Sequence, residues 1–346
     1  MLNTQPTPFS SIIIPALNEE ANIGRCLASI VDMNILRDLY EVIVVDNGST
    51  DRTREIAHSF KGRMNISVII APRVTIAALR NIGVKHAHGD ILSFVDADCT
   101  VSGDWLRNAV CYFTDHTIGA VGSSYTIPKS ASWVAKVWTM NSAKKRIRGE
   151  TEYISTANLH VSRVNFEKIG GFNENLITNE DYDLCFRLRQ LGLTIYADPK
   201  IHVVHWGNPA NLRDFYRREK WHGSHVFNVF LDDIRKLKNI RAISYALYYV
   251  ACSICLLLGF PYFLIYGKLM PILLTSGAVI FPPSLLSVKT IIQQKGRFYY
   301  FFPLFVVYFT YGVARAVSLA KNIWGLVSKN QSIESHWSSK KLKKLQ

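Results

Sequence analysis

Two carboxylates mark the point where a predicted buried strand ends. The apolar run 91–95 is followed directly by Asp96, Ala97 and Asp98. Carboxylate oxygens are ligands that Mg2+ and Mn2+ prefer, and such ions are commonly shared between protein carboxylates and the phosphates of a substrate. This spacing predicts a divalent-metal site, with Mn2+ or Mg2+ as the ion, for a phosphate-bearing substrate. Taken alone the pattern is weak, because carboxylates at strand ends often only form turns or cap helices.

Short runs rich in β-branched residues alternate with helical segments up to these carboxylates. The intervening segments have helical spacing, and the runs are Ser11–Pro15, Glu41–Val45, Ile66–Ile70 and Ile91–Val95. Such alternation predicts an α/β fold, in which helices cover both faces of a parallel sheet. In sheets of this kind, ligands bind beyond the carboxyl ends of the strands.

Polar side chains follow the predicted strands at that edge of the sheet. Asn18 and Glu19 follow the first strand, Asp46 follows the second, and Arg80 comes after the third. The sequence has neither a glycine-rich dinucleotide motif nor a phosphate-binding loop that ends in Gly-Lys-Ser or Gly-Lys-Thr. A bound nucleotide must therefore be held by side chains and by the metal.

Charge divides the chain into two parts. Residues 1–206 contain 21 Lys and Arg and 21 Asp and Glu, whereas residues 207–346 contain 19 and 5, which accounts for the whole net charge of +14. The basic part also contains three apolar stretches, each close to the roughly 20 residues that cross a bilayer, at about 242–266, 269–288 and 298–320. Because zinc-finger and basic-zipper patterns are absent, the expected partner is a membrane and not nucleic acid.

The ends of the chain and its basic clusters bear on location. The N-terminus has no basic region followed by an apolar stretch, so we expect the neutral part, residues 1–206, in the cytoplasm, at the inner or plasma membrane. A cluster before the first apolar stretch favours the cytoplasmic face: Arg235, Lys236, Lys238 and Arg241. Segments 289–297 and 340–344 are basic too, so the number of crossings stays open. Three prolines are expected to bend or break the apolar segments: Pro261, Pro282 and Pro283.

Seven short motifs follow one another through residues 10–206. They are IPALNEE (14–20), VVDNGSTD (44–51), RNIG (80–83), DAD (96–98), GGF (170–172), NEDYDL (179–184) and VVH (203–205). In this order they resemble the family 2 glycosyltransferases, whose GT-A fold is a Rossmann-like nucleotide-diphospho-sugar transferase domain. The resemblance implies transfer of a sugar from a nucleotide-diphosphate donor, with inversion at the anomeric carbon. Asn47 stands where the family often has a second Asp. This departure concerns the exact contact with the nucleoside and does not change the class of enzyme that the resemblance implies.

Inversion in one displacement needs a base, and the resemblance points to Asp181. We expect Asn179 to cap a helix that Gly192 ends and whose apolar face is Leu184, Leu188 and Leu191. In the first turn of such a helix, the dipole and the free backbone amides favour the ionised carboxylate, which is the form a base needs. The alternative is that Glu180, Asp181 and Asp183 only complement the helix dipole.

The same resemblance implies the remaining donor-site residues. A metal at Asp96 and Asp98 offsets the charge that builds on the leaving phosphate. His205 matches a position that completes the metal site in some members, and strand alternation places it opposite His202. An ordinary packed or solvated histidine is the alternative for His205. The nucleotide sugar is expected to contact Pro15, Leu17, Glu19, Asp46, Arg80 and Asp96.

A basic segment with aromatic residues precedes the first apolar stretch. Arg217, Lys220 and Trp221 approximate the Gln/Arg-x-x-Arg-Trp motif that binds the acceptor end and the donor phosphates in processive members of the family. Glu180 is a further candidate on the acceptor side. Basic and aromatic residues together also suit a helix at the surface of an anionic membrane, and the two roles are compatible.

These observations predict four regions and one activity. The regions are a GT-A catalytic domain at 1–206, basic interfacial helices at 207–241, a membrane region of about three helices at 242–320 and a basic tail at 321–346. The predicted activity is sugar transfer to a lipid-linked acceptor of the polyprenyl-phosphate type, in cell-surface or exopolysaccharide assembly. The alternatives are a synthase that glycosylates bare polyprenyl phosphate, similar to the dolichyl-phosphate mannose synthases, and a non-catalytic membrane scaffold.

Overall fold

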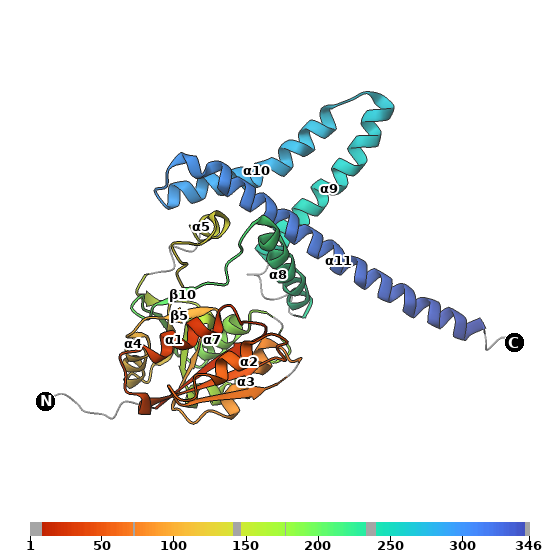
Figure 1. Ribbon diagram of the computed structural model, residues 1–346. Helices are drawn as coiled ribbons and strands as arrows, with labels where there is room; N and C mark the ends of the chain where they lie inside the picture. The colour runs from red at the N-terminus through yellow and green to blue at the C-terminus, as the bar shows by residue number, and fades with distance from the viewer. Residues whose placement is uncertain (1–8, 72, 141–146, 177, 233–239, 343–346) are drawn as a thin grey trace. The chain divides into compact units, whose positions relative to one another are not determined.

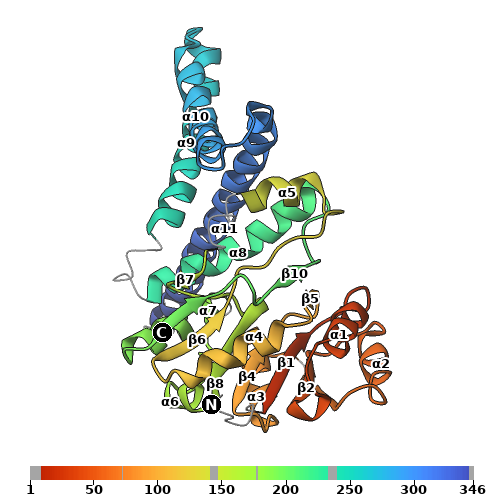
Figure 2. The same ribbon diagram turned by 90° about the vertical axis from the view of Figure 1, so that its left-hand side faces the viewer.

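A computed structural model describes residues 9–71, 73–140, 147–176, 178–232 and 240–342. By contacts between residues, the chain divides into two compact units. The first unit comprises Met1–Ala131 and Ser142–Asn208, and the second comprises Ser132–Asn141 and Pro209–Gln346. Figure 1 and Figure 2 show the elements of both units in two views.

The described part of the first unit is built on an eight-stranded sheet with the order β3-β2-β1-β4-β8-β6-β9-β7. β1 pairs in parallel with β2 and β4, and β2 pairs in parallel with β3. The four predicted strands are confirmed, each to within one residue at its ends. The strands are β1 (Ser10–Ala16), β2 (Tyr40–Asp46), β3 (Ile66–Ile70), β4 (Ile91–Phe94), β6 (Ile118–Gly122), β7 (Gly149–Glu150), β8 (Leu159–Ser162) and β9 (Thr194–Ala197).

The sheet is mixed, so the prediction of a parallel sheet holds only for its first four strands. β8 runs antiparallel to both β4 and β6, β7 runs antiparallel to β9, and β6 pairs in parallel with β9. These later strands are short and contain glycine or polar residues, which weakens the apolar pattern that reveals a buried strand. A second sheet pairs β5 (Cys99–Val101) antiparallel with β10 (Val203–His205).

Helices cover both faces of the large sheet, as predicted (Figure 1). Helices α1 (Ile23–Val31), α2 (Thr53–His58) and α4 (Trp105–Val110) contribute to one apolar core. Helices α3 (Ile76–Lys85), α6 (Arg163–Lys168) and α7 (Glu180–Gln190) contribute to the other. Strand alternation along β1 explains the division, because Ile12 and Ile14 lie in the first core and Ile13 in the second. Among the described residues of this unit there are also three 3-10 turns: η1 (Arg37–Leu39), η2 (Cys111–Thr114) and η4 (Thr156–Asn158).

The ends of α7 differ in part from the prediction. Asn179 precedes the helix, but its backbone is left-handed (φ 65°) and its side chain makes no capping hydrogen bond. The predicted cap is wrong because a side-chain cap needs an extended backbone at that position. Gly192 follows the helix at φ 78° and ends it as predicted. Leu184 and Leu188 are buried, whereas Leu191 lies past the last turn and is exposed.

The described part of the second unit is helical. α5, α8 and α11 share an apolar core that contains Val134, Phe215 and Leu304. α11 lies along α8, where the Ser318 hydroxyl donates a hydrogen bond of 2.8 Å to the Lys220 carbonyl (Figure 2). The elements are α5 (Trp133–Met140), α8 (Leu212–Asp232), α9 (Ile240–Tyr266), α10 (Met270–Gln293), the 3-10 turn η6 (Phe298–Tyr300) and α11 (Phe301–Leu342).

Among the residues that the structure describes in this unit, three helical segments are long and apolar enough to cross a membrane. They are Ser244–Tyr266, Met270–Gln293 and Phe298–Trp324, which correspond to the three predicted apolar stretches. Length and composition therefore support membrane association.

The helices continue through the prolines that were expected to bend or break them. Pro261 lies inside α9, and Pro282 and Pro283 lie inside α10. Some predicted basic residues lie outside the described part of the chain: Arg235, Lys236, Lys238, Lys343 and Lys344.

Candidate active site

The loop after β4 brings Asp98 to a histidine from the far end of the unit. β10 pairs with β5 so that His205 faces Cys99 in the register, and this places the imidazole beside Asp98. His205 Nε2 lies 3.5 Å from Asp98 Oδ2. His205 Nδ1 is buried and has no hydrogen-bond partner among the described residues. His202 lies elsewhere, with its Nε2 3.0 Å from the Thr126 hydroxyl.

The atoms beside Asp98 fit a divalent cation. Asp98, Cys99 and His205 each offer a ligand atom, and these atoms lie within 4.8 Å of one another. Burial raises the pKa of the Cys99 thiol well above its usual value, and the carboxylates of Asp96 and Asp98 raise it further, so the thiol stays protonated. A carboxylate oxygen and an imidazole nitrogen remain, which are ordinary ligands for Mn2+.

Burial dominates the electrostatics of Asp98. It raises the pKa of the carboxyl group, His205 lowers it, and the neighbouring charge of Asp96 raises it again. A carboxylate that burial and a like charge both destabilise gains most from a nearby cation. The electrostatics therefore favour a bound cation at this position.

Gly207 is a site residue that the sequence analysis missed. A Cβ atom at this position would overlap Oδ2 of Asp98, so only glycine allows the backbone to lie this close to the carboxylate. The Trp206 amide donates to the Asp98 carbonyl at 2.8 Å, which holds the loop in place. The predicted VVH motif ends two residues too early to include this glycine.

Arg80 connects a carboxylate in the loop after β4 with a carboxylate at the start of α7. Its guanidinium is buried, and it donates to Asp96 Oδ1 at 2.8 Å and to Glu180 Oε1 at 2.7 Å. Burial acts to lower the pKa of Arg80, but the carboxylates, Asp96 first, raise it overall, so the side chain stays charged. Both terminal nitrogens are therefore occupied by protein carboxylates. This geometry fits a positioning residue that fixes the end of β4 against the start of α7.

Asp181 lies in the first turn of α7, next to Glu180. Burial is the main cause that raises the pKa of this carboxyl to about 7, and the charge of Glu180 adds to it. A hydrogen bond from the Tyr182 amide and the charge of Arg80 act in the opposite direction. The prediction that the helix terminus keeps this carboxylate ionised is therefore wrong in its direction, because burial outweighs the dipole. A pKa near 7 suits a group that accepts and releases a proton at neutral pH.

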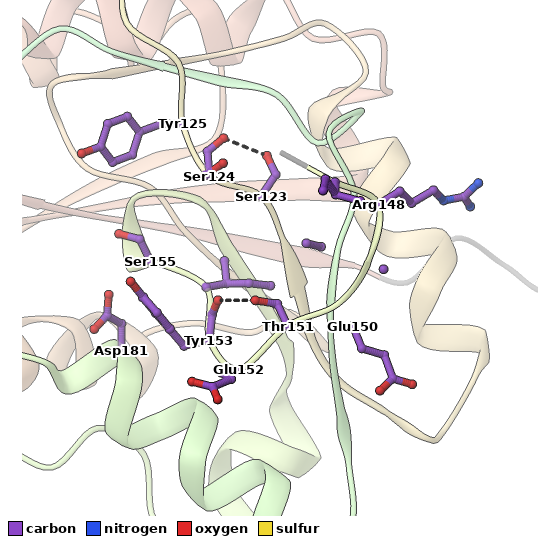
Figure 3. A pocket seen from close by; sticks show the side chains of 14 residues that line it. Ser123, Ser124, Tyr125, Arg148, Glu150, Thr151, Glu152, Tyr153, Ser155 and Asp181 are labelled. Carbon is purple, nitrogen blue, oxygen red and sulfur yellow. Dashed lines mark hydrogen bonds between the residues drawn. The ribbon is translucent and has the colours of Figure 1, made fainter. Parts of the chain in front are cut away.

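A cavity of about 640 Å³ opens beside Asp181. Its walls come from segment 123–125 after β6, from segment 147–155 around β7, and from Ala197 at the end of β9. Figure 3 shows Asp181, Tyr153 and Ser155 close together at one side of this space. Tyr125 lines it too, and its ring lies 4.7 Å from the ring of His205. The cavity thus adjoins both the predicted base and the metal-ligand pair.

The loops after β1 and β2 are tied together on the side of the site predicted to hold the nucleotide. Asn18 has a left-handed backbone (φ 54°), and its Oδ1 accepts from the Thr50 amide at 2.9 Å. Asp46 is fully buried, and its Oδ2 accepts from the amides of Gly48 and Ser49. Asp46 Oδ1 has no partner in the described part of the chain.

The other predicted nucleotide contacts differ in how accessible they are. Pro15 is buried within β1, whereas Leu17 is 50% exposed. Burial raises the pKa of Glu19, a hydrogen bond from Asn22 opposes this, and the charge of Asp98 adds to the increase. The charges of Asp96 and Asp98, the predicted metal ligands, therefore act on Glu19. A contact with nucleotide stays a prediction for all three residues.

Arg217, Lys220 and Trp221 belong to α8 in the second unit. Arg217 and Trp221 are exposed and Lys220 is partly exposed, whereas Glu219 between them is buried. The helix predicted for this segment is confirmed. Its contact with an acceptor or a membrane stays a prediction.

Known proteins share both the sequence and the fold of this chain. The model of "Glycosyl transferase family 2" matches residues 11–170, and that of "Glycosyl transferase family group 2" matches residues 91–313. The glycosyltransferase AglE of Haloferax volcanii is 32% identical over 246 residues, which cover 70% of this chain and 80% of AglE. The beta-monoglucosyldiacylglycerol synthase of Synechocystis is 27% identical over 63% of this chain, which spans only 48% of that protein.

A solved structure has the same fold at lower identity. The mannosyltransferase PcManGT from Pyrobaculum calidifontis, in complex with GDP-Man and Mn2+, superposes with a TM-score of 0.60. It is 20% identical, and the match covers 93% of this chain and 88% of that one. The GT-A fold expected from the motifs is thereby confirmed, and the chain belongs to glycosyl transferase family 2.

Proposed function

We propose that this protein transfers a sugar from a nucleotide-diphosphate donor to a lipid-linked acceptor at a membrane, with inversion at the anomeric carbon. One observation carries the proposal. A carboxyl group with a pKa of about 7, Asp181, lines a cavity and is connected through Glu180 and Arg80 to the carboxylates at the end of β4. Because the chain belongs to a family of glycosyltransferases, we prefer this activity to the alternative of a non-catalytic membrane scaffold.

The donor side would be held by residues around the end of β4. Asp98 and His205 would bind the divalent cation, and Asp96, whose side chain is 31% exposed, lies beside them with one oxygen on Arg80. A bound divalent cation would stabilise the negative charge that develops on the leaving diphosphate. Arg80 fixes Asp96 for this task, so its role is positioning. Asp46 and Glu19 are the proposed contacts of the nucleoside.

Asp181 serves as the general base on the acceptor side. Its carboxylate accepts the proton of an acceptor hydroxyl while the oxygen forms a bond to the anomeric carbon. In the same step the bond from that carbon to the diphosphate oxygen breaks, and the electron pair leaves with the nucleoside diphosphate. Attack from the side opposite the leaving group inverts the configuration.

The acceptor is proposed to be attached to a lipid. The support is the second unit, whose three long apolar helices belong to the same chain as the catalytic residues. A relative named beta-monoglucosyldiacylglycerol synthase acts, by its name, on a lipid. We assign residues 1–206 to catalysis on the cytoplasmic side of the inner or plasma membrane, 207–241 to the interface, 242–320 to the membrane and 321–346 to a basic tail.

The direct test uses the full-length protein purified in detergent. Nucleotide sugars, starting with GDP-mannose, are incubated with Mn2+ and a membrane lipid extract, and lipid products are identified by mass spectrometry. A glycosylated lipid that forms with the natural protein and not with Asp181→Asn supports the proposal. Glu167→Gln is a matched control, because this exposed carboxylate lies on α6 and lines no part of the cavity. Transfer only to water-soluble acceptors would overturn the lipid-linked part.

A further inference from the structure

The three long apolar segments described in the second unit differ in how far the rest of the protein covers them. In the most apolar part of Phe298–Trp324, 44% of the residues are buried, against 17% for Ser244–Tyr266 and 11% for Met270–Gln293. Residues 303–316 of α11 include no exposed position, whereas both other segments carry many exposed apolar side chains. α9 and α10 therefore present a surface that suits lipid, and α11 lies among other helices.

One side of α11 is covered by α8, which is rich in charge. Six of the first nine residues of α8 are charged. Phe215 and Leu304 belong to one apolar core, and Glu219 Oε2 lies 2.9 Å from Arg315 Nη2, so the contact runs along the middle of α11. Arg217 of α8 is exposed and needs water or lipid head groups around it. The partner of α11 on this side is thus a helix that suits the membrane surface.

The depth of a bilayer decides whether this arrangement can cross it. Position 311 is the centre of Phe298–Trp324, and a helix rises about 1.5 Å per residue, so Arg315 would lie about 6 Å from the midplane if this segment crossed. The stretch from Leu304 to Ser318 that packs with α5 and α8 would occupy about 20 Å of a hydrocarbon core about 30 Å thick. The charged turns of α8 would then lie near the centre of that core, where exposed charges are costly. A position of both helices at the membrane surface avoids this cost.

The other side of α11 packs against one end of the pair formed by α9 and α10. A Cβ atom at Gly312 would come within 2.6 Å of the Tyr249 ring, so the two helices are in close contact there. The hydroxyls of Tyr308 and Thr290 lie 2.6 Å apart. Tyr249 lies near the start of the apolar segment of α9 and Thr290 near the end of α10, and segment 267–269 joins the two helices at their other ends (Figure 1). The middle of α11 therefore lies across the open end of a helical hairpin.

The backbone of the hairpin is completed by hydrogen bonds between its two helices. Pro282 has no N–H group to offer the Ala278 carbonyl, and this carbonyl accepts a hydrogen bond of 2.7 Å from the Tyr248 hydroxyl of α9. The Tyr249 hydroxyl donates in the same way, at 3.2 Å, to the Val279 carbonyl, which lies four residues before the second proline. Backbone groups inside a bilayer need such partners because no water is present. The pairing therefore fits a hairpin that is surrounded by lipid.

Basic residues gather at the open end of the hairpin. Arg241 lies at the start of α9, and Lys295 and Arg297 follow α10. The connection at the closed end has one basic residue, Lys268. Basic residues favour the cytoplasmic side, so this pattern favours the open end there. With α11 at the surface, the basic tail at 340–344 stays on the same side, whereas a third crossing would separate it from the other basic residues.

We propose that α9 and α10 cross the membrane as a hairpin and that α11 lies with α8 at the membrane surface, so that the described chain crosses the membrane twice. The partner of the hairpin is the hydrocarbon core of the bilayer, and the partner of α8 and α11 is its head-group layer. Residues 1–206 and the basic tail then lie on the same side. The inference goes beyond the proposed function, because sugar transfer at a membrane requires no particular number of crossings.

The experiment locates three positions of the full-length chain in bacterial cells. GFP and alkaline phosphatase are fused in turn to the C-terminus, where GFP fluoresces only in the cytoplasm and the phosphatase is active only outside it. A maleimide that does not cross membranes labels Lys268→Cys or the exposed natural thiol of Cys111, which reports residues 1–206. We expect fluorescent GFP, inactive phosphatase, Lys268→Cys labelled in intact cells, and Cys111 labelled only after permeabilisation. The natural chain, which lacks the added thiol, is the control for labelling in intact cells.

Two results would overturn the inference. One is a C-terminus on the opposite side from Cys111, which means a third crossing. The other is Lys268→Cys on the same side as Cys111, which means that the hairpin does not cross. If all three positions were inverted together, the two crossings would stand, and the cytoplasmic location of the catalytic part in the proposed function would fail.

Two lysine substitutions test the depth of the helices directly. Ile254→Lys puts a charge at an exposed position in the middle of α9, and Val317→Lys puts one at an exposed position of α11, about 9 Å from the centre of its apolar segment. Membrane-integrated protein is measured as the fraction that resists carbonate extraction. We expect Ile254→Lys to lower this fraction severalfold and Val317→Lys to leave it near the natural value. Equal losses would place α11 in the hydrocarbon core and overturn the inference, as would no loss in either variant.

Discussion

Each unit contains a cluster of three charges centred on a buried side chain, and the two clusters have opposite signs. In the first unit, the Arg80 guanidinium lies between the carboxylates of Asp96 and Glu180. In the second, the Glu219 carboxylate lies between two arginines, with Arg315 Nη2 at 2.9 Å and Arg218 Nε at 3.4 Å. One cluster thus has a surplus negative charge and the other a surplus positive charge.

The cluster of the second unit makes an arginine tolerable in an apolar segment. Arg315 lies within the candidate span Phe298–Trp324, where an unpaired charge would be costly. Glu219 of α8 neutralises it, and Gly223 lets the two helices come close, because a Cβ there would lie 3.1 Å from the Arg315 side chain. The pairing explains why α8, although rich in charge, packs along α11.

The opposite surplus charges of the two clusters indicate different roles. A surplus of negative charge at the end of β4 favours a divalent cation and, through it, a diphosphate. The positive cluster lies between α8 and α11, where the ion pairs stabilise the packing of the two helices. Separate changes in each cluster should therefore have separate effects.

Removal of the cation should have the largest effect. Excess chelator should abolish transfer, Mn2+ or Mg2+ should restore it, and Asp98→Asn should give a comparable loss with an unchanged circular dichroism spectrum, since Asp98 and His205 are the proposed ligands. Asp104→Asn is the control, because this carboxylate forms an exposed pair with Arg107. Full turnover in excess chelator would contradict a cation-dependent site.

Loss of the base should come next. Asp181→Asn should slow transfer about 10²- to 10⁴-fold, which is the usual contribution of general-base catalysis. Donor binding, measured by calorimetry, should change little because Asp181 is the proposed base on the acceptor side. If Asp181→Asn kept full activity, the neighbouring carboxylates of Glu180 and Asp183 would be tested instead.

Breaking the two clusters should destabilise the two units separately. Arg80→Leu leaves the Glu180 and Asp96 carboxylates without their cation, and loss of one partner of a buried pair costs about 3–5 kcal/mol in the free energy of unfolding. Glu219→Leu should have a similar cost in the second unit, and the double change Glu219→Leu with Arg315→Leu should recover part of it. Urea unfolding of the full chain in detergent measures these differences. Additive losses in the double variant would show that the Glu219–Arg315 pair is not coupled.

The pH dependence of transfer should report Asp181. Its pKa is raised to about 7, so the fraction in the basic form falls about tenfold for each pH unit below that value. The rate should rise with pH up to about 7 and then level off. The free energy of unfolding should change in the opposite direction. A folded state with a raised carboxyl pKa binds a proton more readily than the unfolded chain, so protonation of Asp181 stabilises the fold at low pH. This stabilisation is lost as pH rises through 7. A rate that is flat between pH 5 and 8 would exclude Asp181 as the base.

The smallest effect is expected at the exposed face of α8. Arg217→Ala and Lys220→Ala should each weaken binding to anionic vesicles by about 1 kcal/mol, with no effect on neutral vesicles. Lys85→Ala, an exposed lysine at the end of α3, is the control in the first unit. Flotation of the protein with vesicles of defined composition provides the measurement. Equal flotation of all variants would remove the membrane role from these two residues.

Local patterns in the sequence predicted the strands and helices better than the contacts between them. The β-branched runs identified β1 to β4, and family motifs identified Asp98, Asp181 and His205 as candidates. Nothing local reveals that Arg80 bonds to Glu180, which is 100 residues away, because that contact depends on how α3 and α7 cover one face of the sheet. The ion pair between Glu219 and Arg315 likewise depends on how α8 and α11 pack, which no local pattern reveals.

The cavity beside Asp181 could not be predicted from the sequence either. Its walls come from segments around β6, β7 and β9, none of which carries a motif, and only the folded sheet brings them beside Asp181. The raised pKa of Asp181 was missed for a related reason. Helix position can be read from sequence, but burial, which dominates that pKa, depends on the tertiary structure.

Gly207 allows the backbone after β10 to lie against Asp98, one of the two proposed metal ligands. The glycine lies directly against Asp98, His205 is two residues before it, and α8 begins after the short segment 209–211. Any side chain at position 207 would have to displace the Asp98 carboxylate, so the spacing between the two proposed ligand atoms depends on a glycine that carries no polar group in its side chain.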